Sequence, residues 1–222
     1  MIIFFRIPSE SPNIRKISIA LEEMGLPYVE KVVNTGLSDE LDEEFVRISP
    51  NRTAPAILDT ETGVTIFESA AILIYLAEKS GKFLPTESRK RAEVVQWLMF
   101  EAANVCPTMI ELHHFLLNDT GEYPTELFER YKNRLEKYCT ILDHQLENQA
   151  YLAGDFSIAD IILFPWTVAL EDMAEINVAD YPSLYNWVAR ISSRQSIKQV
   201  ETSSPENTSW CFQKGKVLLC SA

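Results

Sequence analysis

The hydrophobic residues of positions 1–80 follow strand-like and helix-like patterns in turn. An apolar run over 1–7 predicts a strand. The apolar residues that follow recur at spacings of three and four, which predicts one face of a helix that ends at Gly25. That face consists of Ile14, Ile17, Leu21 and Met24. The chain is therefore expected to begin with a strand and an amphipathic helix.

Further patterns of both kinds complete this half of the chain. The sequence predicts a strand over 28–33, a short acidic helix over 40–48, a hairpin of strands 56–58 and 64–67, and a helix over 70–79. This order implies a right-handed crossover between parallel strands, followed by an antiparallel hairpin in the same sheet. We therefore expect an α/β fold of the thioredoxin-like kind.

From residue 88 onward the hydrophobic pattern is helical. Residues 88–117 read as one long helical stretch, and apolar and aromatic residues between 127 and 146 repeat at spacings of three and four. Ser157 and Asp160 have the spacing of a capping box, which predicts a buried helix starting there. We expect a thioredoxin-like domain over 1–81 and an all-α domain over 88–200, and we assign no structure to the tail over 201–222.

Composition narrows the possible partners. The chain of 222 residues is 46% hydrophobic and carries a formal net charge of −12, so it lacks the basic surface that nucleic acids and anionic lipids require. The N-terminus is too short and too early charged for a signal peptide, and the longest apolar stretch is too short to span a membrane. The four cysteines form no Cys-x-x-Cys pair. We expect a cytoplasmic protein with reduced cysteines and neither nucleic acid nor membrane as partner.

Two segments carry residues suited to binding a short extended peptide. Pro55 heads a predicted strand, and a cis bond before it would turn the backbone of Ala54 outward, where a peptide can pair with it. Glu68 and Ser69 open a predicted helix. A carboxylate there can accept from an ammonium, while the hydroxyl and the free N–H groups of the helix start can bind a carboxylate. These groups fit a γ-glutamyl end. The alternative is an edge-strand proline and an ordinary helix N-cap.

Ser11 and Asn13 lie where the first strand gives way to the first helix. With Pro12 at the first helical position, Ser11 fits an ordinary N-cap. A thiol placed at this helix start would meet a hydroxyl donor, an amide donor and the positive end of the helix dipole, and each favours the thiolate. A γ-glutamyl anchor, an extended backbone and a thiolate site together fit glutathione.

Over residues 4 to about 200 the chain resembles the cytosolic glutathione transferases, most closely their Nu class, which is related to the yeast nitrogen regulator that carries a transferase domain. The resemblance rests on motifs that occur in the same order as in that family. They are residues 11–16, 47–51 with Pro55, 67–72, 75–79, 113–115, 129–131 and 157–160.

The resemblance implies a role for each matching residue. Ser11 and Asn13 take the places of the hydroxyl residue and the asparagine that hold the glutathione sulfur in the Nu class. The resemblance implies that Asn13 also belongs to the residues that bind glutathione. The others are Arg52, Thr53, Ala54, Pro55, Glu68 and Ser69, with Arg130 reaching the site from the helical domain. The family commonly has Asn-Lys where this chain has Arg52 and Thr53, so Arg52 stands in for that lysine.

Three functions compete on these grounds. The first is glutathione-dependent reduction of a small disulfide, which uses two glutathione molecules in turn. The second is conjugation of glutathione to a small electrophile, and the third is a regulatory or ligand-binding protein without catalysis. The resemblance also implies a homodimer. His113 and His114 are adjacent and therefore not spaced as metal ligands, so we expect glutathione as the cosubstrate and no metal.

Overall fold

The computed structural model describes residues 1–8, 11–33, 43–117 and 125–203. Its first half is a four-stranded sheet in the order β2-β1-β3-β4. The strands are β1 (Ile2–Arg6), β2 (Tyr28–Val32), β3 (Ala56–Asp59) and β4 (Val64–Phe67). β1 pairs with β2 in parallel and with β3 antiparallel, and β3 pairs antiparallel with β4. This is the predicted thioredoxin-like topology, so that expectation is confirmed.

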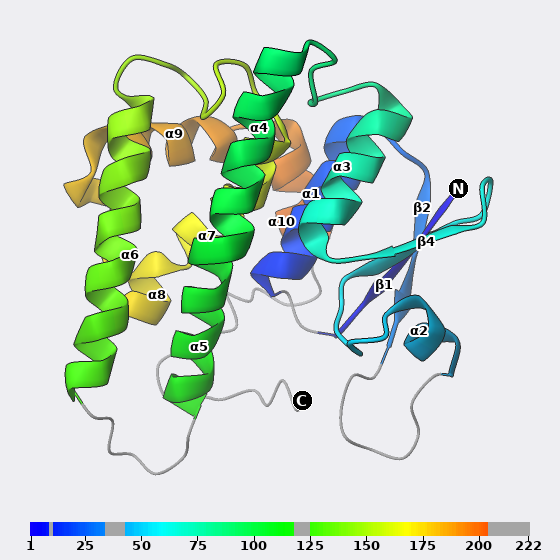
Figure 1. Ribbon diagram of the computed structural model, residues 1–222, viewed down its shortest axis with the longest axis horizontal. Helices are drawn as coiled ribbons and strands as arrows, with labels where there is room; N and C mark the ends of the chain where they lie inside the picture. Colours follow the sequence, from blue (N-terminus) through cyan, green and yellow to red (C-terminus); the bar gives the residue numbers. More distant parts are fainter. Residues whose placement is uncertain (9–10, 34–42, 118–124, 204–222) are drawn as a thin grey trace.

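Three helices flank the sheet, namely α1 (Pro12–Met24), α2 (Glu43–Ile48) and α3 (Ser69–Ser80). α1 and α3 lie side by side between the sheet and the helical half (Figure 1). Side chains alternate along a strand, so β1 buries Phe4 in the main core and Phe5 with Phe45 of α2 in a second cluster. Both faces of the sheet are therefore covered. The predicted helix over 40–48 begins at Glu43 in the structure, and residues 40–42 lie outside the described part.

The second half of the chain is helical, as predicted. Its elements are α4 (Ser88–Phe100), the π-helix η1 (Glu101–Val105), α5 (Cys106–Leu117), α6 (Thr125–Leu146), α7 (Ile158–Val168), α8 (Leu170–Ala174), the 3₁₀ helix η2 (Val178–Asp180), α9 (Pro182–Ser192) and α10 (Gln195–Ser203). The helix predicted over 88–117 forms, but its middle turn is a π-helix. An extra residue in a turn leaves no clear mark on hydrophobic periodicity, so the sequence did not indicate it.

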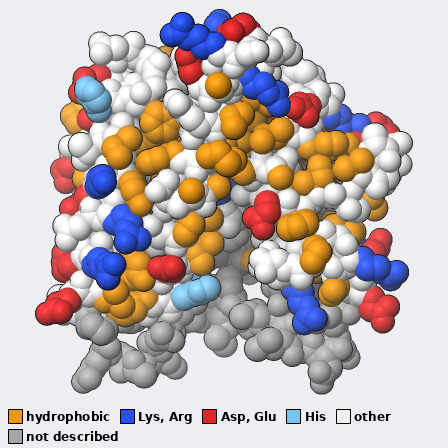
Figure 2. All heavy atoms as spheres, in the orientation of Figure 1, with side chains coloured by type: hydrophobic (Ala, Val, Ile, Leu, Met, Phe, Trp, Pro, Cys, Tyr) orange, Lys and Arg blue, Asp and Glu red, His pale blue; other side chains and the backbone are white. Residues whose placement is uncertain are grey.

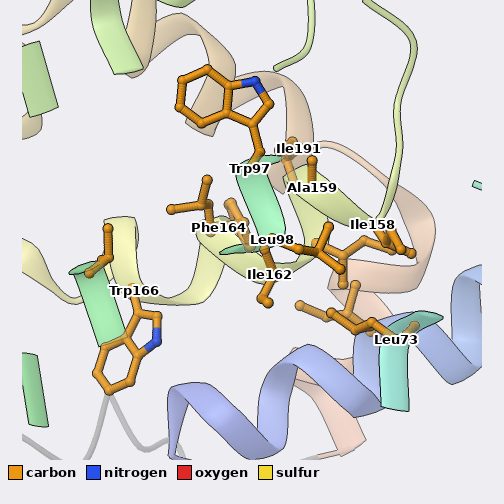
Figure 3. Close-up of a cluster of buried hydrophobic side chains, with 14 of the residues drawn as sticks. Leu73, Trp97, Leu98, Ile158, Ala159, Ile162, Phe164, Trp166 and Ile191 are labelled. Carbon is orange, nitrogen blue, oxygen red and sulfur yellow. The ribbon is translucent and has the colours of Figure 1, made fainter. Parts of the chain in front are cut away.

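α7 forms the centre of the helical half and joins it to the sheet half. Nearly all of its side chains are buried, and they pack against α1, α3, α4 and α9. Figure 3 shows Leu73 of α3, Leu98 of α4 and Ile191 of α9 around Ile158 and Ile162 of α7. The two halves therefore share one hydrophobic core.

The predicted capping box at the start of α7 is confirmed. Ser157 Oγ accepts from Ala159 N, and the Asp160 carboxylate accepts from Ser157 N at 2.9 Å. The same carboxylate also accepts from Leu152 N at 3.0 Å and from Trp187 Nε1 of α9 at 2.8 Å. Ser157 Oγ donates to this carboxylate as well, at 3.2 Å, so the fully buried Asp160 satisfies four donors that water cannot reach. The box therefore ties a loop, α7 and α9 together.

Two of the four cysteines lie within the described residues, and both are free thiols. Cys139 is buried on α6, as expected of a packing cysteine, whereas Cys106 is half-buried at the start of α5. Cys211 and Cys220 lie outside the described residues, as does most of the unassigned tail. In the described part of the chain no helix has the length and apolar character to cross a bilayer.

Candidate functional site

Ser11 is the N-cap of α1. Its Oγ accepts a hydrogen bond from Ile14 N at 3.3 Å, and Pro12 stands at the first helical position. The predicted N-cap is therefore confirmed. A serine hydroxyl that accepts through a lone pair keeps its own hydrogen for donation. Capping the helix and donating to a bound anion are thus compatible roles for one side chain.

Asn13 lies on the first turn of α1 with its amide held in one orientation. Its Oδ1 accepts from Lys16 Nζ at 2.6 Å. Among the described residues, its Nδ2 has only a weak partner, the Sγ of Cys106 on α5 at 3.9 Å. Because an ammonium can only donate, this contact assigns the oxygen to Lys16 and leaves the NH₂ group as a donor.

Lys16 and Glu101 form an ion pair at the junction of the two halves. Lys16 Nζ lies 2.6 Å from Glu101 Oε1, and the two side chains are 0% and 1% exposed. Glu101 is the first residue of the π-helix η1. Sequence reasoning missed both roles. Glu101 is a lone charge in an apolar stretch between Trp97 and Met109, which was the available signal.

The Ala54–Pro55 peptide bond is cis, the condition that the peptide-docking interpretation needs. Pro55 is buried, and β3 begins directly after it. Ser49 Oγ donates to the carbonyl oxygen of Thr53 at 2.8 Å, which fixes the preceding turn. Within the described residues no hydrogen bond reaches the backbone of Ala54, so its N–H and C=O are available to a ligand. Arg52 is exposed beside it, with a φ of 58°.

Glu68 and Ser69 stand at the start of α3. Glu68 has a φ of 70°, an unusual value for a residue with a Cβ and one that costs about 1–3 kcal/mol. Such backbone is found more often at functional sites than elsewhere. The Glu68 carboxylate is exposed and makes no hydrogen bond within the described part of the chain. Ser69 is half-buried, and its Oγ accepts from Lys16 Nζ at 3.5 Å.

These contacts bring the two predicted subsites together. Asn13 of the first subsite and Ser69 of the second contact the same Lys16 ammonium. The N-termini of α1 and α3 therefore meet at one place and supply hydroxyl, amide and backbone N–H donors. Figure 2 shows a recess on this side of the molecule, between the helical half and the sheet half. Donors of this kind suit a ligand that carries negative charge.

Of the two cysteines in the described residues, Cys106 is the one that contacts these donors, with its Sγ 3.9 Å from Asn13 Nδ2. Burial raises the pKa of its thiol to about 11, against a lowering by the Lys16 charge. The thiolate is the nucleophilic form of a cysteine, and burial disfavours it at Cys106. Cys106 is therefore a poor source of thiolate at this site, which suits a thiol that the ligand brings.

Arg130 does not join this group. It is exposed on α6, and α5 lies between α6 and the sheet half in Figure 1. His113 and His114 lie on α5; burial lowers the pKa of His113, and the charge of His114 adds to this effect. Among the described residues no cluster of histidine, cysteine and acidic side chains could hold a metal ion.

Comparison with known proteins identifies two matching family models. Residues 10–79 match the glutathione S-transferase N-terminal domain, and residues 105–195 match the glutathione S-transferase C-terminal domain. The chain is also 39% identical over 195 residues to the disulfide-bond oxidoreductase YfcG of Escherichia coli, an alignment that covers 85% of this chain and 90% of that protein.

Two solved structures share the fold at similar identity. A glutathione transferase family member from Pseudomonas fluorescens, solved with two glutathione molecules bound, is 34% identical with a TM-score of 0.81 and covers 89% of this chain and 91% of its own. A glutathione transferase from Pseudomonas putida, with one glutathione disulfide bound per subunit, is 31% identical with a TM-score of 0.79 and covers 89% of both chains. The matched domains and their order along the chain agree with the observed fold, and the protein therefore belongs to the glutathione S-transferase family.

Proposed function

We propose that this protein is a glutathione-dependent disulfide reductase. The observation that carries the proposal is the start of α1, where Ser11 and Asn13 supply two donors. Burial of the neighbouring Cys106 raises the pKa of its thiol, which disfavours a protein thiolate there. Such a site stabilises a thiolate but does not provide one. The name of the relative from Escherichia coli and the glutathione disulfide bound in the relative from Pseudomonas putida support the same assignment.

In this proposal Ser11 and Asn13 are the catalytic residues that hold the glutathione sulfur. The backbone of Ala54, next to Pro55, pairs with the central residue of glutathione. Glu68 accepts from the γ-glutamyl ammonium, and Ser69 with the first N–H groups of α3 binds its carboxylate. The glycine end falls to Arg52 and Thr53. Arg130, implied by the family resemblance, lies on α6 apart from these groups and is given no contact in this arrangement. Glutathione is the cosubstrate, and no metal takes part.

The reaction proceeds by two thiol–disulfide exchanges. A first glutathione thiolate attacks one sulfur of a small disulfide, forms a mixed disulfide and releases the other half as a thiolate. A second glutathione thiolate then attacks the mixed disulfide at the glutathione sulfur, which gives glutathione disulfide and the second thiol of the substrate. The relative from Pseudomonas fluorescens, with two glutathione molecules bound, supports a site with room for both.

Parallel assays of one preparation test the reaction class. We expect faster turnover with 2-hydroxyethyl disulfide, followed through coupled reduction of the glutathione disulfide formed, than with chlorodinitrobenzene, followed as conjugate. A rate that is higher with the electrophile would instead assign conjugation as the main activity. Glutathione binding without either turnover would favour the regulatory function.

The Glu68→Ala variant tests the γ-glutamyl contact. The lost carboxylate leaves the ammonium of the ligand without its partner, and a hydrogen bond to a charged group contributes about 1.5–3 kcal/mol. We expect the dissociation constant for glutathione to rise at least tenfold in a calorimetric titration, with little change in the pH at which the bound thiol ionises. Glu171→Ala, at an exposed position of α8, is the matched control and should bind normally. Unaltered affinity in Glu68→Ala would exclude this contact.

We also propose the class of the chain within the family, its domain bounds and its assembly. We place the chain in the Nu class on its Ser11 and Asn13 pair, with a glutathione-binding domain over 1–81 and a helical domain over 88–200. We further propose a cytoplasmic homodimer. A reducing compartment fits both the supply of glutathione and the free thiols of Cys106 and Cys139.

A further inference from the structure

Within the described residues, Lys16 donates three hydrogen bonds at the centre of the candidate site, each to an oxygen acceptor. Its Nζ lies 2.6 Å from Glu101 Oε1, 2.6 Å from Asn13 Oδ1 and 3.5 Å from Ser69 Oγ. An ammonium has three hydrogens to donate and no lone pair to accept with. The side chain is 0% exposed, so these oxygens take the place of water around it.

These contacts decide which hydrogen-bonding groups face a ligand. With Oδ1 bound to Lys16, Asn13 can present only its NH₂ group, and with Oγ accepting, Ser69 keeps its hydroxyl hydrogen for another partner. Asn13 otherwise could turn its amide by half a turn and present an acceptor, which repels a thiolate. One buried ammonium therefore sets two neighbouring side chains as donors.

We propose that Lys16 is a positioning residue, which fixes Asn13 and Ser69 as donors toward the sulfur and the γ-glutamyl carboxylate of glutathione. The inference rests on the proposed function. Lys16 need not touch glutathione, because the Asn13 amide and the Ser69 hydroxyl lie between the ammonium and the ligand groups that they bind.

Glu101 is the second part of this arrangement. A buried ammonium without a partner carries a large desolvation cost, and the Glu101 carboxylate at 2.6 Å offsets part of it. Lys16 Nζ also lies 5.5 Å from the ring centre of Trp166, whose face favours a cation. Glu101 comes from η1, and π-helical turns occur frequently at functional sites. The helical half thereby supports the donors of the sheet half across the junction.

A double substitution tests the inference without leaving a buried charge. Lys16→Met alone would leave Glu101 buried without a partner, which costs about 3–5 kcal/mol of stability. Replacing both members of a buried pair with apolar side chains of similar size is often neutral for stability. The variant is therefore Lys16→Met with Glu101→Met. Its control, Arg91→Met with Glu78→Met, removes a surface ion pair of the same 2.6 Å length that also joins the two halves.

The readouts are the dissociation constant of glutathione by calorimetry and the pH dependence of thiolate absorbance of the bound ligand. In the double variant we expect binding weakened about tenfold, as for one lost hydrogen bond to a charged group, and thiol ionisation moved to higher pH. The control should match the parent protein. Loss of packing alone would lower thermal stability and leave the ionisation curve unmoved, and that result would overturn the inference.

A double-mutant cycle that combines the Lys16 and Glu101 substitutions with Asn13→Ala tests whether Lys16 affects thiol ionisation through Asn13. If Lys16 acts on the sulfur through Asn13, the double substitution shifts the ionisation curve in the parent background and not in Asn13→Ala. An equal shift in both backgrounds contradicts the inference. Binding and ionisation of glutathione are measured without turnover, so a parent protein that ionises glutathione yet reduces no disulfide refutes only the proposed function. A parent protein that does not bind glutathione refutes both.

Discussion

Replacing Ser11 with alanine is expected to lower turnover with a small disulfide by more than tenfold at neutral pH. The variant removes the hydroxyl donor, and a hydrogen bond to a charged group contributes about 1.5–3 kcal/mol, or roughly one to two units of thiol pKa. Without the donor the thiolate is less stable, so the pKa of the bound thiol rises. The rate should recover as the pH is raised, which a pH–rate profile measures.

Two further substitutions at this position separate catalysis from helix capping. Ser11 Oγ also accepts from Ile14 N, so alanine costs about 1 kcal/mol of stability through loss of the cap. Glycine is nearly as good an N-cap as serine but has no hydroxyl, so Ser11→Gly should lose activity with little loss of stability. Ser11→Thr keeps both groups and should remain active. Full turnover in Ser11→Gly would remove the hydroxyl from the mechanism.

Replacing Asp160 with alanine is expected to destabilise the fold by about 4 kcal/mol. The substitution leaves Leu152 N, Ser157 N and Trp187 Nε1 without their acceptor in a site that water does not reach, and each unsatisfied buried donor costs about 1–3 kcal/mol. Urea unfolding followed by circular dichroism measures the change through the shift of the midpoint.

Asp155 provides the matched control for that substitution. It lies near the same capping box but is exposed, and its carboxylate makes no hydrogen bond within the described residues. Surface substitutions of this kind usually change stability by less than about 0.5 kcal/mol. A loss below about 1 kcal/mol in Asp160→Ala would show that the donors find other partners. It would also mean that the box contributes little beyond starting α7.

Local patterns predicted most of the fold because the forces behind them are local. The N-cap at Ser11, the capping box at Ser157 and Asp160, and the strands and helices predicted for the sheet half hold in the structure, as far as the described residues reach. Each depends on residues within a few positions of one another, so the sequence states them directly. The sequence did not predict the π-helix over 101–105, because a single inserted residue changes the hydrophobic period too little to be recognised.

The sequence predicted the site residues at the helix starts but not the buried ion pair behind them. Ser11, Asn13, Glu68 and Ser69 stand at predicted helix starts, and that position gives each of them free donors or acceptors. Lys16 looked like one more polar residue of an amphipathic helix. Its partner Glu101 lies 85 positions further along the chain, and spacing within a single sequence does not connect the two.

By itself, the sequence determined the order of the elements, the caps of α1 and α7 and the residue types at the start of α1 and α3. Only the tertiary structure decided that Lys16 and Glu101 meet in a buried pair, that Asn13 and Ser69 share this ammonium, and that Arg130 stands apart from them on α6. The reason is physical. Local structure depends on backbone preferences and hydrophobic period, whereas a buried charge finds its partner only when the core that excludes water has formed.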